Sequence, residues 1–168
     1  MATELYDLTV PVFLRGFAAM AKFLDKGRAY ADEHNLPHEA LLNARLFEDM
    51  APLTAQIQRA SDAAKFAAAR LAQIDGPAMP DTEASFDELQ ARIAATVAFL
   101  ESVDAKTMNG REDADITIVT PNKSFHMQGR AYALNFALPN FYFHTTTAYA
   151  ILRAKGVPVG KMDFLGGI

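Results

Sequence analysis

Apolar residues recur at alternating intervals of three and four along much of the chain, which is the spacing that places them on one face of an α-helix. The most regular run keeps this alternation for about seven helical turns, through Leu46, Met50, Leu53, Ile57, Ala60, Ala64, Ala67 and Leu71. Pro52 lies inside this run, and a proline removes one backbone hydrogen bond from a helix. The pattern therefore predicts a long helix that is kinked near Ala51.

An earlier segment carries the same apolar stripe, in Phe13, Phe17, Met20, Leu24, Gly27 and Ala31. Because Pro11 precedes this stripe, the helix either begins near Thr9, whose hydroxyl can cap it, or kinks at the proline. It ends within residues 33–37, which include Pro37.

Two further helices have boundary signals of their own. Ser85 and Glu88 form a capping-box pattern, which predicts a third helix that starts there and ends near Asp104. Pro139 has the fixed φ angle that suits a first helical turn, and Gly156 suits a left-handed cap. The last helix is therefore expected to begin at Pro139 and to end before Gly156.

The segment between the third and the last helix differs from the rest of the chain. Residues 116–120 are mostly β-branched, and residues 124–128 follow them across a short Pro-Asn-Lys turn. This arrangement predicts a small β-hairpin, which needs the helices beside it for stability. The chain is thus predicted to be all-α, a four-helix bundle with a small β-hairpin insert before the last helix.

Composition limits the functions that such a bundle can have. The 168 residues fit one domain spanning 1–168, and a net charge of −4 with interspersed signs predicts no nucleic-acid partner. The lack of cysteine excludes disulfides and thiolate chemistry and favours a cytoplasmic protein. Arg15 and Lys22 interrupt the first apolar run, so no membrane association is expected.

Three stretches carry a family resemblance: PNFYFHTTTAYAILRAKGVPVGKMDFLG at residues 139–166, LYDLTVPVFLRGF at residues 5–17 and ARLFEDMAPLTAQIQRASDAAK at residues 44–65. They resemble the DUF1993 family, which is similar to the DinB/YfiT-like superfamily. The resemblance implies a bundle with an up-down-down-up arrangement and a homodimer. Many DinB-like proteins hold a divalent metal with three histidines, one on the second helix and an HxxxH pair on the last.

The resemblance also implies where such a metal would bind in this chain. It places His144 at the second histidine of the pair, Asn140 at the first and Asp49 at the histidine of the second helix. A catalytic zinc or nickel ion needs about three protein ligands, and an amide oxygen is a weak one. Any metal is therefore expected to bind more loosely than in a three-histidine relative.

The residues themselves support a site around His144 and leave its nature open. His144 shares an apolar stripe with Phe141, Ala148 and Ile151, so its ring is expected to face the interior. A hydrogen-bonded interior histidine has the same pattern. Asp49 can equally pair with Arg45, one turn earlier, and Asn140 can satisfy local backbone groups.

Two classes of function follow. The first is a metal-dependent enzyme that acts on a small molecule, with Gln56 or Asn140 orienting the substrate and Tyr142 lining the pocket. The second is a non-catalytic bundle that binds a small ligand or a protein partner. The sequence does not decide between them, and it does not establish that the protein is an enzyme.

Overall fold

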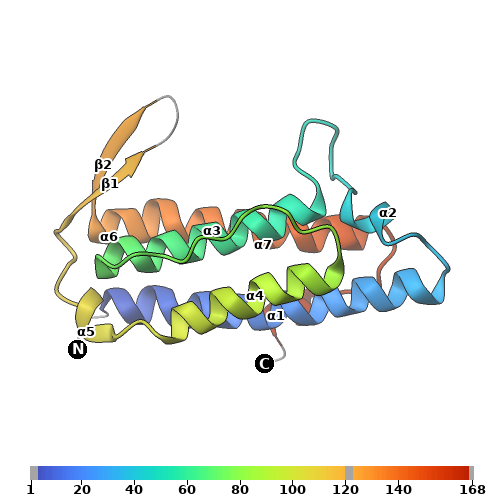
Figure 1. The fold of residues 1–168 in the computed structure, drawn as a ribbon, viewed down its shortest axis with the longest axis horizontal. Helices are drawn as coiled ribbons and strands as arrows, with labels where there is room; N and C mark the ends of the chain where they lie inside the picture. Colours follow the sequence, from blue (N-terminus) through green and yellow to red (C-terminus); the bar gives the residue numbers. More distant parts are fainter. Residues whose placement is uncertain (1–3, 120–122, 167–168) are drawn as a thin grey trace.

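The computed structural model describes residues 4–119 and 123–166, and within them four long helical rods run side by side (Figure 1). They are α1 (Leu5–Glu33), α3 (Leu53–Ala72), α4 (Phe86–Glu101) and a last rod that ends in α7 (Leu138–Ala154). The first and last rods run in one direction and the two middle ones in the other (Figure 1). The predicted four-helix bundle with its up-down-down-up arrangement is confirmed.

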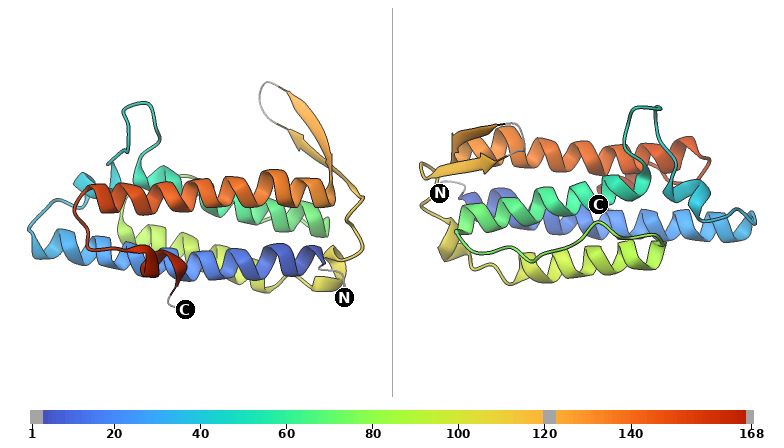
Figure 2. Two further views of the ribbon diagram at one scale, coloured as in Figure 1. Left: turned by 180° about the vertical axis from the view of Figure 1, so that it is seen from behind. Right: turned by 45° about the horizontal axis from the view of Figure 1, so that its top comes forward.

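Short elements connect and flank the rods. Helix α2 (Glu39–Leu42) follows α1, and α5 (Ala105–Met108) follows α4, with Asp104 capping its first turn through a 2.9 Å bond from the Lys106 N–H. Helix α8 (Lys161–Leu165) lies against α1 at the end of the chain (Figure 2). None of the helices in the described ranges has the length and apolarity needed to cross a membrane.

Helix α1 begins at Leu5, before Thr9, and Pro11 lies inside it. The Thr9 hydroxyl does not cap the helix but donates to the Leu5 carbonyl, 2.7 Å away. One missing backbone donor is a small loss in a helix of 29 residues that buries a long apolar face. Of the two alternatives, a start near Thr9 is therefore wrong, and the helix runs through Pro11 as the other alternative requires.

Helix α3 begins at Leu53, so the predicted helix from Leu46 with a kink at Ala51 is wrong. Pro52 has extended backbone angles, with φ −70° and ψ 170°, and stands at the N-cap, where a missing N–H costs nothing. The residues before it form turns, and the Leu53 N–H donates to the Ala44 carbonyl at 2.9 Å. Leu46 consequently lies outside the core.

The third helix agrees with its predicted start. The Glu88 N–H donates to Ser85 Oγ at 3.2 Å, and the Glu88 carboxylate accepts from the Ala84 N–H at 2.7 Å. A crossover segment, residues 73–85, runs back along the bundle before this helix (Figure 2). Buried Arg92 of α4 holds the segment through Asp81 and Glu83, each 3.0 Å away.

The last rod begins ten residues before the predicted start at Pro139. It comprises α6 (Gly129–Tyr132), a π-helical segment η1 (Ala133–Ala137) and then α7. A proline ring collides with the carbonyl four residues earlier in a regular α-helix, here that of Asn135. The wider turns of η1 include this carbonyl, so the rod passes through the proline. At the other end Gly156 has a φ of 93°, as its predicted left-handed cap requires.

The predicted hairpin is present as an antiparallel pair of β1 (Asp115–Val119) and β2 (Ser124–Gln128), in which Asp115 pairs with Gln128. Its expected turn lies outside the described residues. β1 buries Ile116 and Ile118, and the ring of Phe125 meets that of Phe136 edge-on at a centroid distance of 5.9 Å. The hairpin therefore leans on the start of the last rod.

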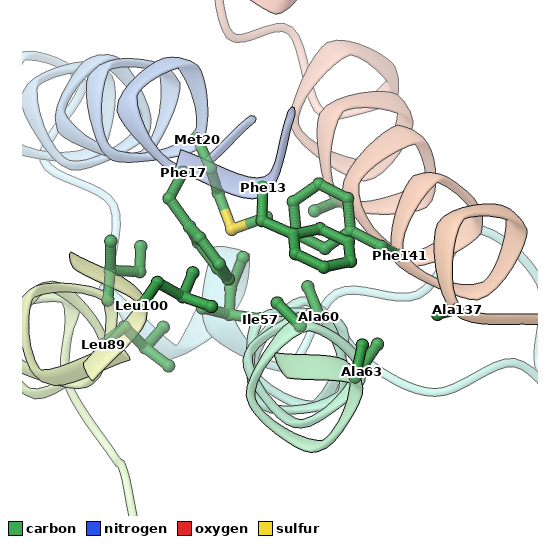
Figure 3. Packing of buried hydrophobic residues seen from close by; sticks show 14 of the residues in the cluster. Phe13, Phe17, Met20, Ile57, Ala60, Ala63, Leu89, Leu100, Ala137 and Phe141 are labelled. Carbon is green, nitrogen blue, oxygen red and sulfur yellow. The ribbon is translucent and has the colours of Figure 1, made fainter. Parts of the chain in front are cut away.

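Phe141 fills the centre of the core (Figure 3). Its ring meets Phe13 and Phe17 of α1 edge-on, at centroid distances of 4.9 Å and 5.2 Å. α1 approaches so closely that a Cβ atom on Gly16 would lie 2.6 Å from the ring. Only a glycine fits at residue 16, and the apolar stripe of α7 is thereby fixed toward the bundle axis.

Replacing Phe141 with alanine is expected to lower the free energy of unfolding by about 3–5 kcal/mol, because a fully buried ring leaves a cavity. Urea unfolding followed by circular dichroism measures this loss. Phe47→Ala is the control, since that side chain is 63% exposed and its removal should change stability by no more than about 0.5 kcal/mol. Equal losses in the two variants would contradict this account of the core.

Candidate functional site

The buried imidazole of His144 on α7 is held by one hydrogen bond to α3. Its Nδ1 atom lies 2.8 Å from Gln56 Oε1, and the Gln56 amide nitrogen donates to the Ala51 carbonyl at 2.9 Å. Because that carbonyl can only accept, the amide orientation of Gln56 is fixed and its oxygen faces the histidine. Nδ1 therefore carries the hydrogen, and Nε2 keeps a free lone pair.

His144 lines a cavity of about 230 Å³ between α3 and the last rod, which we call the His144 cavity. Its Nε2 atom has no hydrogen-bond partner among the described residues. The polar lining consists of Arg59, Asp62, Arg70, Tyr132, Asn140 and His144. Apolar walls come from Ala63, Phe66, Ile118, Phe136 and Ala137. The cavity thus combines an apolar interior with a few polar groups, as small-molecule sites do.

Burial and charge keep His144 neutral. Desolvation, and then the positive charge of nearby Arg59, lower the pKa of His144 from its ordinary 6.5 to about 4. At neutral pH the ring is therefore an uncharged base that presents an acceptor to the cavity. It can hydrogen bond to a donor on a bound molecule.

The other charged groups of the cavity differ in how far they are already engaged. Arg70 donates to the Tyr132 hydroxyl at 3.0 Å, and its guanidinium lies 5.1 Å from the centroid of the Phe66 ring. Asp62 is bound by Lys65 at 2.9 Å and by Arg92 at 3.0 Å. Arg59 has no ion pair or hydrogen bond within the described part of the chain. Arg59 is exposed, and its charge is available to a ligand.

Among the site residues predicted from the sequence, the structure brings together His144, Asn140 and Gln56. Asn140 lies one turn before His144 and lines the same cavity, and its amide makes no hydrogen bond within the described ranges. Gln56 positions the imidazole. Its predicted role, orienting a substrate, stays a prediction.

Asp49 and Tyr142 lie elsewhere. Asp49 is exposed in a turn before α3, since that helix starts only at Leu53, and it does not line the His144 cavity. Its predicted place on the second helix is wrong. Tyr142 lines a different cavity of about 80 Å³ beside α1 and α8. Two residues rotate a helix by about 200°, so Tyr142 points away from the face that carries His144.

The residues present do not make the three-ligand metal site that the resemblance implies. Among residues 4–119 and 123–166, no group of three or more histidine, aspartate or glutamate side chains lies close enough together to hold a metal ion. Asn140 and His144 supply two donors, one of them a weak amide oxygen. The guanidinium of Arg59 beside them repels a cation.

Sequence reasoning did not identify Arg59, Arg70 or the phenylalanine walls. A signal was present, because Gln56, Arg59, Ala63, Phe66 and Arg70 follow one another at intervals of three and four residues. These residues form a second stripe on α3 beside the apolar one. Such a polar stripe is ordinarily read as a solvated face, and only the position of α7 makes it one wall of a cavity.

Comparison with known proteins identifies a protein family and a solved structure to which the chain is similar. A family profile described as "Domain of unknown function (DUF1993)" matches residues 5–165. The chain is similar to a solved structure of a DinB family member protein from Shewanella denitrificans, with 38% sequence identity, a TM-score of 0.90 and coverage of 98% of this chain and 93% of that one. No curated protein matches the chain. The resemblance seen in the sequence is thereby confirmed.

The lowered pKa of His144 predicts a pH dependence of stability. Between about pH 6.5 and pH 4 the unfolded chain binds a proton at this residue and the folded chain does not, so stability should fall as the pH falls through this window. Solvent in the cavity limits the loss to on the order of 1–2 kcal/mol. Urea unfolding at several pH values measures it, and an NMR titration of the ring gives the pKa directly.

The matched control is His144→Gln, which should remove this part of the pH dependence and leave the rest. A difference between wild type and variant that stays constant from pH 7 to pH 4 would contradict the lowered pKa.

Proposed function

The chain belongs to the DUF1993 family of DinB-like proteins, and we propose that its function is to bind a small organic molecule in the His144 cavity. The observation that carries this proposal is the fixed tautomer of His144. Gln56 and the Ala51 carbonyl orient the ring so that an unpaired Nε2 acceptor faces a mostly apolar space.

The open hydrogen-bonding positions of the cavity support a ligand. His144 Nε2, the half-buried Asn140 amide and the exposed guanidinium of Arg59 have no hydrogen-bond partner within the described residues. A bound molecule with a hydrogen-bond donor would satisfy Nε2 and cover the apolar walls at the same time.

The cavity also limits the size of the molecule. A volume of about 230 Å³ is below the roughly 300–1,000 Å³ of pockets that enclose drug-sized ligands. A molecule the size of a single substituted ring fits this space. A neutral histidine that can accept a proton leaves room for acid–base chemistry on such a molecule, although the binding proposal does not require it.

Phenol is a suitable probe, because it has a ring and one neutral donor. We expect phenol at millimolar concentration to shift backbone amide NMR signals of residues 56–70 and 132–144 in the wild type. His144→Leu should weaken binding roughly 3- to 10-fold, because one hydrogen bond is lost. His34→Leu, on the exposed end of α1, is the control and should bind like the wild type.

A cavity-filling variant makes the phenol test independent of His144. Ala63→Leu projects extra side-chain volume into the cavity and should abolish the shifts. Shifts that persist in Ala63→Leu, or that gather on other residues in the wild type, would disprove the proposal.

The metal-dependent enzyme inferred from the resemblance remains a prediction, with His144, Asn140 and Asp49 as its expected ligands. Because Asp49 lies in an exposed turn, we expect Zn²⁺ and Ni²⁺ to change the melting temperature equally in the wild type and in His144→Leu. Thermal unfolding with and without each ion measures this. A stabilisation of the wild type that disappears in both His144→Leu and Asn140→Ala would contradict this expectation and would support a metal site at these two residues.

The predicted homodimer and cytoplasmic location also stay predictions. Sedimentation at high protein concentration decides the first, since a monomer under those conditions rejects it.

A further inference from the structure

The positive charge of Arg59 in the His144 cavity favours one class of ligand. Arg59 lies on α3 one turn after Gln56, lines the cavity and has no partner in the described part of the chain. Its charge acts on the histidine, since it is one of the two causes of the lowered His144 pKa. A cation that lines the same cavity as the acceptor atom favours a ligand that carries a negative charge.

The carboxylate of the cavity does not neutralise Arg59. Asp62 lies one turn farther along α3 and is bound by both Lys65 and Arg92. Arg92 in turn is held by Asp81 and Glu83, with its side chain only 1% exposed, so this ion network is anchored away from the cavity. Arg59 is left as a cation without a counter-ion.

Asn140 stands on the facing rod and lines the cavity with Arg59. Its side-chain amide can donate two hydrogen bonds and has no partner within the described ranges. A guanidinium and an amide together match a carboxylate, which accepts several hydrogen bonds at once. The same two groups would also accept the oxygens of a phosphate.

The apolar walls of the cavity favour a carboxylate ligand over a phosphate. Phe66 and Phe136 line the cavity with aromatic rings, and Phe136 stacks on Tyr132 with an interplanar angle of 20° and a centroid distance of 5.8 Å. Small side chains at Ala63 and Ala137 leave space between the rods. Such walls cover a flat apolar body and would leave a free phosphate ion poorly solvated.

From this arrangement, and resting on the proposed function, we propose that the ligand is a small carboxylate with a flat apolar body. The carboxylate lies against Arg59 and Asn140, and the body lies along Phe66 and Phe136. His144 Nε2 accepts a hydrogen bond from a donor on the same molecule. The carboxylate and the hydrogen bond to His144 together set the orientation of the molecule.

The test compares benzoate with benzamide, which have nearly the same shape and differ in charge. Binding of each is measured from the amide shifts of residues 56–70 and 132–144 at low salt. We expect the wild type to bind benzoate roughly tenfold more tightly than benzamide, because a charge-assisted pair is stronger than a neutral hydrogen bond. Added salt should weaken only benzoate binding.

Variants at residue 59 test whether Arg59 causes the preference for benzoate. Arg59→Met should remove the preference for benzoate and leave phenol binding unchanged, whereas Arg59→Lys should keep part of the preference. Arg153→Met is the matched control, because Arg153 is an exposed arginine of α7 that does not line the cavity. It should retain the full preference. A preference that survives in Arg59→Met overturns the assignment.

The outcomes separate this inference from the proposed function. If benzamide and phenol bind in the cavity as tightly as benzoate does, the anionic ligand is disproved while the binding function stands. If no probe shifts signals of the cavity, both proposals fail. If inorganic phosphate binds at Arg59 more tightly than benzoate does, the flat apolar body is disproved.

Discussion

The close packing of α3 against α7 is the constraint on which the site depends. Gln56 and His144 are 88 residues apart in the sequence, and only this packing brings them within 2.8 Å. α3 is rich in buried alanines, among them Ala60, Ala64 and Ala67, which let a neighbouring helix approach closely. Phe141, one turn before His144 on α7, fixes the rotation of that helix by filling the space that Gly16 leaves open. The core therefore determines the direction in which the imidazole points.

Much of the fold could be predicted from the sequence, because its apolar stripes and caps are local signals. The capping box at Ser85, the left-handed cap at Gly156 and both hairpin strands were found this way. The two largest errors concern prolines. Pro52 stands at the start of a helix and Pro139 lies within one, although apolar periodicity continues on both sides of each. A π-helical segment relieves the clash at Pro139, and no residue pattern in the sequence predicts that segment.

The site could be predicted only in part, for a related reason. The stripe of α7 shows that His144 faces inward, and helical spacing places Asn140 beside it. The resemblance places Asp49 on the second helix only if that helix extends through Pro52, so the error in the helix start removes Asp49 from the site. Arg59 was missed because its environment is created by α7 and by the hairpin. Contacts between distant segments depend on packing, which one sequence shows only indirectly.

The oriented His144–Gln56 pair is not what core packing alone requires, and this supports the proposed binding role. A leucine at residue 144 would bury more apolar area and would leave no acceptor without a partner. The chain instead holds a histidine in a single tautomer through a glutamine that is itself fixed by the Ala51 carbonyl. It also places Arg59 where that charge makes protonation of the ring harder. A neutral, oriented acceptor beside an unpaired cation adds little to the core. This arrangement supports the proposal that the cavity binds a small molecule with a donor and a negative charge.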